Sequence, residues 1–128
     1  MLVCPDLAIR DNLTFLLQHF GFRIVNAAEG RQAWTEIGRS SPDLIVMLES
    51  SHKMNGDELC IRIRELSDAP IIVLGQEPEE IAGVEFLEMG ADAYLTSPLS
   101  LRELMARVRS LLRYTRPLQK RGRERREQ

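Results

Sequence analysis

The sequence predicts a doubly wound α/β domain, in which helices cover both faces of a parallel sheet. Five short apolar runs alternate with five segments of helical periodicity. The runs are continuously apolar, which is typical of strands buried on both sides. A chain of 128 residues, of which 44% are hydrophobic and 28% charged, is long enough for one such domain. In this fold class, ligands bind beyond the carboxyl ends of the strands.

The first half of the chain predicts three strands and two helices. Apolar residues recur at helical spacing from Ile9 to Phe20, and Gly21 is a usual helix end. A second helical pattern begins at Gly30 and predicts that Trp34 faces the core. The turn residues 41–43 end it before the apolar run that starts at Leu44. In chain order the elements are a strand at 1–3, a helix at 9–20, a strand at 22–27, a helix at 30–37 and a strand at 44–48.

The second half predicts two strands and three helices. Pro78 suits the first turn of a helix, and Ser100 with Glu103 forms a capping-box pattern before the last one. The apolar stripe of that last helix extends to Leu112. In chain order the elements are a helix at 56–66, a strand at 70–75, a helix at 78–89, a strand at 93–96 and a helix that begins after Ser100.

Charge is distributed unevenly along the chain. Residues 1–112 contain 10 Lys and Arg against 17 Asp and Glu, whereas residues 113–128 contain 7 against 2. An acidic body excludes a general nucleic-acid-binding surface, so only the basic tail could contact phosphates. No apolar stretch suits a membrane span or a signal peptide, and two distant cysteines do not indicate a disulfide framework or a zinc site. These features predict a cytoplasmic protein that does not contact membranes.

Several segments together resemble a response-regulator receiver domain, most closely of the OmpR/PhoB type. They are "PDLIVML", "MNGDELCIRIREL" and "GADAYLTSPLSLRELMARVRSLLRY". The resemblance covers residues 1–114 and implies a flavodoxin-like three-layer sandwich with five helices and strand order 2-1-3-4-5. Proteins of this type carry a winged-helix DNA-binding domain after the receiver. Residues 115–128 are then a basic linker or disordered tail, and the effector domain is absent from this chain.

The resemblance also implies a phosphorylation site, which this sequence does not match. A working receiver accepts a phosphoryl group from a histidine kinase on an aspartate that ends the third strand. Two acids bind Mg²⁺, and a hydroxyl and a lysine bind the phosphate. The corresponding residues here are Leu48 for the acceptor, Cys4 and Pro5 for the acids, Gly75 for the hydroxyl and Ser97 for the lysine. We therefore expect a pseudo-receiver with no catalytic residue, metal or cofactor, which is not an enzyme.

The alignment at Leu48 rests on two spacings. Leu48 lies six residues after Pro42 and eight before Gly56, as the acceptor does in the family. Glu49 would point to the opposite face of the strand. A weak phosphoacceptor that uses Glu49, Ser50 or Ser51 remains an alternative.

Four other residues near the strand ends are open to two interpretations. Asp6 is either a weak metal ligand or a helix-capping residue, because a lone carboxylate binds Mg²⁺ poorly. Cys4 and His52 are either a metal or redox pair or solvated loop side chains. Tyr94 occupies the family's switch-aromatic position, and without a hydroxyl at Gly75 we expect it to pack in one rotamer.

The resemblance further implies a homodimer through the fourth helix, fifth strand and fifth helix. Two expected ion-pair partners are missing, at Gly83 and Ala93, and the alternative is a solvated charged face. The candidate residues are Ile81, Gly83, Val84, Glu88, Asp92, Glu103 and Arg107. We predict a two-component-type transcription regulator that acts by phosphorylation-independent dimerisation or partner binding, and that contacts DNA only through the absent effector domain. A stand-alone protein-binding adaptor remains the alternative.

Overall fold

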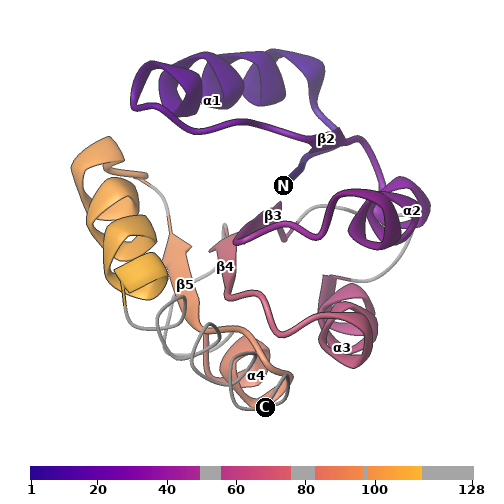
Figure 1. The fold of residues 1–128 in the computed structure, drawn as a ribbon. Coiled ribbons are helices and arrows are strands. Elements are labelled where there is room, and N and C mark those ends of the chain that lie inside the picture. The colour runs from indigo at the N-terminus through magenta and orange to yellow at the C-terminus, as the bar shows by residue number, and fades with distance from the viewer. Residues whose placement is uncertain (50–55, 76–82, 97, 114–128) are drawn as a thin grey trace, which may run out of the picture.

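A central parallel sheet of five strands forms the frame of the domain. The computed structural model describes residues 1–49, 56–75, 83–96 and 98–113. The strands lie in the order β2-β1-β3-β4-β5, as expected from the sequence (Figure 1). Their bounds are β1 Leu2–Val3, β2 Asn26–Ala27, β3 Ile45–Leu48, β4 Ile71–Gly75 and β5 Ala93–Thr96.

Helices cover both faces of this sheet. The described residues contain α1 Leu7–His19, α2 Gly30–Ser40, α3 Gly56–Leu66, α4 Val84–Glu88 and a C-terminal helix at 101–113. Figure 1 shows α1 and the C-terminal helix on one side of the sheet, with α2, α3 and α4 on the other. The domain is therefore the predicted three-layer sandwich.

Two apolar clusters hold the layers together. The first lies between the sheet and α2, α3 and α4, and includes Met47, Val73 and Tyr94. The second lies between the sheet and α1 and the C-terminal helix, and includes Leu48 and Leu74. Neighbouring strand residues thus enter opposite clusters, because successive side chains of a strand point to opposite faces. This alternation decides which side each residue at the strand ends occupies.

Three elements differ from the sequence prediction. The second strand contains only Asn26–Ala27 rather than residues 22–27. The described part of the predicted helix at 78–89 is α4, Val84–Glu88, and residues 76–82 lie outside the described residues. The prediction that Trp34 faces the core is wrong, because its side chain is exposed and the Arg62 guanidinium lies 4.8 Å from the ring centroid. In the described part of the chain, no helix has the length and apolar character needed to cross a membrane.

Candidate functional site

The residues of the expected phosphorylation site lie along the carboxyl edge of the sheet. Leu48 is the last residue of β3 and pairs with Leu74, and Gly75 is the last residue of β4 and pairs with Thr96. Cys4 directly follows β1, where its N–H donates to the Ala27 carbonyl oxygen at 2.9 Å. The fold therefore brings the matching positions of β1, β3 and β4 to one edge. Ser97 lies outside the described residues.

The space where an acceptor carboxylate and its metal acids would gather is apolar. Leu48, Leu74 and Cys4 belong to the second apolar cluster, and the exposed fractions of Leu48 and Cys4 are 8% and 0%. Pro5 is exposed and carries no metal-binding atom. Among the described residues, no group of three His, Cys, Asp or Glu side chains could hold a metal ion. Around Leu48, the described part of this edge therefore consists mainly of packed apolar side chains.

Cys4 is a buried thiol, so the interpretation of Cys4 as a solvated loop side chain is wrong. Its Sγ donates to the Asp6 carbonyl oxygen at 3.3 Å. Burial raises the pKa of the Cys4 thiol above its ordinary value of 9.0. A thiol held in its neutral form is a poor nucleophile and a poor metal ligand. His52, its suggested partner, lies outside the described residues.

Asp6 has a local structural role at the start of α1. It is the N-cap residue of this helix, and its Oδ1 accepts a hydrogen bond from the Ile9 N–H at 3.0 Å. Such a cap satisfies one of the free N–H groups of the first turn. The structure therefore agrees with the interpretation of Asp6 as a helix-capping residue.

The polar contact at this edge lies on the opposite face from Leu48. Glu49 follows β3, and its Oε2 accepts a hydrogen bond from the Tyr94 hydroxyl at 3.0 Å. Tyr94 is 4% exposed and belongs to the first apolar cluster. Sequence reasoning placed Glu49 on the face opposite Leu48 but missed this contact, because 45 positions separate the two residues. Glu49 is therefore engaged in a hydrogen bond with a buried tyrosine.

Gly75 and Phe86 form the walls around the Tyr94 ring. A Cβ atom built on Gly75 would collide with the Tyr94 hydroxyl, ζ carbon and an ε carbon. The ring of Phe86 on α4 stacks on the Tyr94 ring, with centroids 5.7 Å apart and an interplanar angle of 18°. The space that a serine or threonine side chain would occupy at position 75 is thus filled by Tyr94. Tyr94 is packed inward in this structure, and its restriction to a single rotamer stays a prediction.

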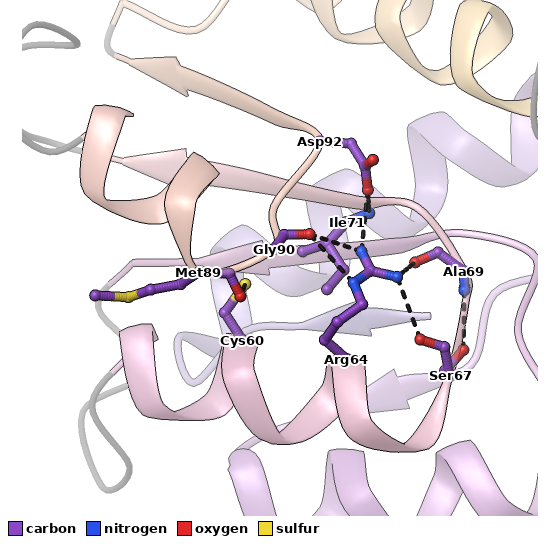
Figure 2. A network of polar contacts seen from close by, with 8 residues as sticks. All are labelled: Cys60, Arg64, Ser67, Ala69, Ile71, Met89, Gly90 and Asp92. Atoms are coloured by element: carbon purple, nitrogen blue, oxygen red, sulfur yellow. Dashed lines mark hydrogen bonds and ion pairs between the residues drawn. The ribbon is translucent and has the colours of Figure 1, made fainter.

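Arg64 of α3 holds the other end of β5. Its guanidinium donates to the Gly90 carbonyl oxygen at 2.7 Å from Nη2, and to the Ala69 carbonyl oxygen at 2.8 Å from Nη1 (Figure 2). Nη2 also lies 3.1 Å from Oδ2 of Asp92, which accepts the Ile71 N–H at 2.8 Å. This network links α3 to the loop before β5, and no motif in the sequence indicated it.

Most dimer candidates that the structure describes are exposed, with one exception. Val84 is 53% exposed, and Glu88, Glu103 and Arg107 are also exposed. Gly83 is buried and has helical dihedral angles directly before α4, with φ of −59° and ψ of −44°. The Asp92 carboxylate bonds within the chain to Arg64. The candidates outside the described residues are Ile81 on this face and Ser50 and Ser51 near β3.

A hollow of about 550 Å³ lies at the opposite edge of the sheet from Leu48. Phe22, Leu44, Val108 and Leu112 are among the residues that line it. Because it lies at the amino ends of the strands, it is separate from the edge at which ligands bind in this fold class.

Comparisons with known proteins agree with this fold. A model of the response regulator receiver domain matches residues 2–109. The chain is 36% identical over 113 residues to "Sensory transduction protein RegX3" of Mycolicibacterium smegmatis. The matched region covers 88% of this chain and 50% of the relative. It is 39% identical over 118 residues to "Probable transcriptional regulator ycf27" of Cyanophora paradoxa, covering 90% of this chain and 48% of the relative. The chain spans about half the length of these curated relatives.

Solved structures show the same architecture. The receiver domain of the TMAO respiratory system response regulator TorR matches with a TM-score of 0.79 and 32% identity, covering 87% of this chain and 93% of that one. A response regulator receiver domain protein from Clostridium thermocellum matches with a TM-score of 0.84 over 91% of this chain and 95% of that one. At 17% identity, the second match supports the fold alone.

Proposed function

This chain belongs to the response regulator receiver domain family, and from that premise we propose that it is a signalling module that works without accepting a phosphoryl group. The family is one of two-component signalling proteins, so the role of the chain is regulatory rather than catalytic. Its state depends on concentration or on a bound partner, because the residues that receive a phosphoryl signal are replaced.

The apolar packing of Leu48 carries this proposal. A leucine side chain has no atom that can attack phosphorus, and Leu48 lies in one cluster with Cys4 and Leu74. A phosphoryl group would also need a cation to offset its charge, and among the described residues no group of three His, Cys, Asp or Glu side chains could hold a metal ion. Glu49, the nearest acid along the chain, bonds to Tyr94 on the other face. This contact argues against Glu49 as a substitute acceptor.

We further propose that the chain is the receiver part of a transcription regulator of the OmpR/PhoB type. One relative is named as a probable transcriptional regulator and others as response regulators, and this chain covers about half of each. Residues 115–128 would then be a basic linker to a DNA-binding domain. Such a protein acts in the cytoplasm, where its DNA target lies.

The output of the module is a homodimer through α4, β5 and the C-terminal helix. Val84 and Leu87 of α4 are 53% and 47% exposed, and Glu103 and Arg107 of the C-terminal helix are exposed as well. Exposed ion pairs are worth only about 0–1 kcal/mol each, so the apolar residues of α4 supply most of the contact energy. With two expected ion-pair partners missing, we expect a weak dimer.

Sedimentation equilibrium at several protein concentrations tests this output. We expect a concentration-dependent dimer whose dissociation constant does not change when acetyl phosphate and Mg²⁺ are added. Arg107→Glu should weaken the dimer because it reverses a charge on the proposed face. The same charge reversal at Arg31, an exposed residue of α2, is the matched control and should have no effect.

Two results would contradict the proposal. A strict monomer at high concentration would remove the dimer and favour a stand-alone adaptor that binds another protein. A dimer that tightens with the phosphodonor would mean that the chain still receives a phosphoryl signal.

A further inference from the structure

Gly75 is a glycine for which the backbone provides no reason. The positive-φ glycines among the described residues are Gly21 and Gly90, so Gly75 lies in a region of φ that every residue adopts. It is also the last residue of a buried strand, where a side chain would normally add packing. The reason for glycine is instead the Tyr94 ring, which fills the volume that a Cβ atom would need.

Glu49 supplies the polar partner for this buried ring. A phenol hydroxyl taken out of water requires a hydrogen-bond acceptor, and the 3.0 Å bond from the Tyr94 hydroxyl to Glu49 Oε2 provides a charged one. The Glu49 backbone is itself held to β4, because its N–H donates to the Leu74 carbonyl oxygen at 2.9 Å. The acceptor is thus attached to the same strand whose last residue makes room for the ring.

Phe86 transmits this arrangement to α4. Its ring is 6% exposed and stacks on that of Tyr94, so displacement of one ring would disturb the packing of the other. Val84 and Leu87 lie on the same short helix and point to solvent. Outward movement of Tyr94 would leave a hole beside Phe86 and change how α4 packs on the sheet.

We propose that Gly75, Glu49 and Phe86 form a fixed seat for Tyr94, so that α4 and β5 present one surface at all times. The seat replaces a phosphorylation-driven movement with a permanent contact. This inference rests on the proposed function, because it explains how a receiver that takes no phosphoryl group can still display its α4–β5 surface.

Fluorine NMR of 3-fluorotyrosine-labelled protein tests the seat. The sequence contains two tyrosines, so in the Tyr114→Phe variant Tyr94 is the one labelled residue. We expect one resonance with a small H₂O-to-D₂O isotope shift, because the ring is buried. Acetyl phosphate with Mg²⁺ should leave that resonance in place. Any resonance with the isotope shift of a solvent-exposed ring would overturn the proposal.

Variants of the seat give the complementary measurement. Gly75→Ala should displace the ring and produce a resonance with an exposed isotope shift. Gly38→Ala is the matched control, because a Cβ atom at Gly38 of α2 meets no atom within 4 Å, and its spectrum should equal that of the parent. Glu49→Gln keeps an acceptor and should keep the ring inward, whereas Glu49→Ala should release it. A Gly75→Ala spectrum identical to the parent would overturn the proposal.

Intact-mass measurement on the same samples separates this inference from the proposed function. A chain that gains a phosphoryl group while its Tyr94 resonance stays unchanged would contradict the proposed function and support the seat. A chain that gains none but has a Tyr94 resonance with the isotope shift of a solvent-exposed ring would overturn the seat and leave the proposed function standing. The Tyr114→Phe spectra decide the question without any substitution in the seat.

Discussion

Leu48 occupies the position at which a phosphoryl-accepting aspartate was expected, at the carboxyl edge of the sheet. It ends β3 and is 8% exposed, in one apolar cluster with Cys4 and Leu74. A carboxylate at this position would lie among the apolar side chains of this cluster. Apolar residues at the positions of both the acceptor and one metal-binding acid are therefore consistent with each other, because a single charged group buried among apolar side chains would be costly.

Restoring the acceptor alone should harm the fold. We expect Leu48→Asp to lower the free energy of unfolding by about 2–4 kcal/mol, because it removes apolar contacts and buries an unpaired charge. Urea unfolding at neutral pH measures this loss. Leu48→Met is the control, since it conserves volume and should cost less than about 1.5 kcal/mol. A Leu48→Asp variant as stable as the parent would show that the site is not packed as described.

Cys4 predicts a pH dependence of stability. Burial raises the pKa of its thiol in the folded chain above 9.0, so the unfolded chain releases this proton at lower pH. The stability from the neutral thiol is present below pH 9 and is lost as the pH rises from 9 through the folded-state pKa. Unfolding free energies measured between pH 8 and pH 10 should fall more steeply for the parent than for Cys4→Ala. Equal slopes would mean that Cys4 is not shielded from water.

Sequence spacing was sufficient to locate Leu48 but not the contact beside it. Pro42 and Gly56 define the position of Leu48 along the chain, and period-two alternation then separates it from Glu49. The bond between Glu49 and Tyr94 depends on how β3 and β5 lie around β4, and that distance is not encoded in any local pattern. The same holds for the contact of Gly75 with the Tyr94 ring.

At the scale of elements, continuous apolar runs were the most reliable signal. β3, β4 and β5 agree with their predicted positions to within one residue, since buried parallel strands require apolar side chains on both faces. β2 is an edge strand of two residues, and apolar residues before it line the hollow at the amino edge instead. The prediction for Trp34 was wrong because helical spacing alone does not show whether an aromatic ring enters the core. In the structure the Arg62 guanidinium covers the ring of Trp34 at the surface instead.

Arg64 connects three elements in a way that its position in α3 does not reveal. Its guanidinium reaches carbonyl oxygens of the loop before β4 and of Gly90, and also the Asp92 carboxylate (Figure 2). Gly90 has a φ of +112°, and a Cβ atom there would lie 3.3 Å from Arg64 side-chain atoms. The planar guanidinium suits several acceptors at fixed angles, which an ammonium group cannot match.

Arg64→Lys should therefore destabilise the domain although it keeps the charge. We expect a loss of about 1–3 kcal/mol, because carbonyl oxygens that are partly buried lose their donors. Thermal or urea unfolding measures it. Arg39→Lys is the matched control on α2, where Arg39 makes one exposed ion pair with Glu36, and it should change stability by less than about 0.5 kcal/mol. Equal effects of the two substitutions would remove the structural role of Arg64.

At the scale of the whole molecule, the domain has the receiver architecture. The fold and the family were predictable from the sequence because both depend on apolar periodicity and on motifs spread over the chain. The seat around Tyr94 and the Arg64 network fix opposite ends of β5 on the sheet. These contacts support the proposal that the α4–β5 surface does not depend on a phosphoryl signal.

Intact-mass measurement after treatment with acetyl phosphate and Mg²⁺ shows directly whether the chain accepts a phosphoryl group. A receiver domain that retains its aspartate, treated in parallel, is the control and should gain one phosphoryl group. We expect the mass of this chain to stay unchanged, because Leu48 cannot accept the group and the edge around it is packed. A mass increase of one phosphoryl group on the wild-type chain would contradict the account.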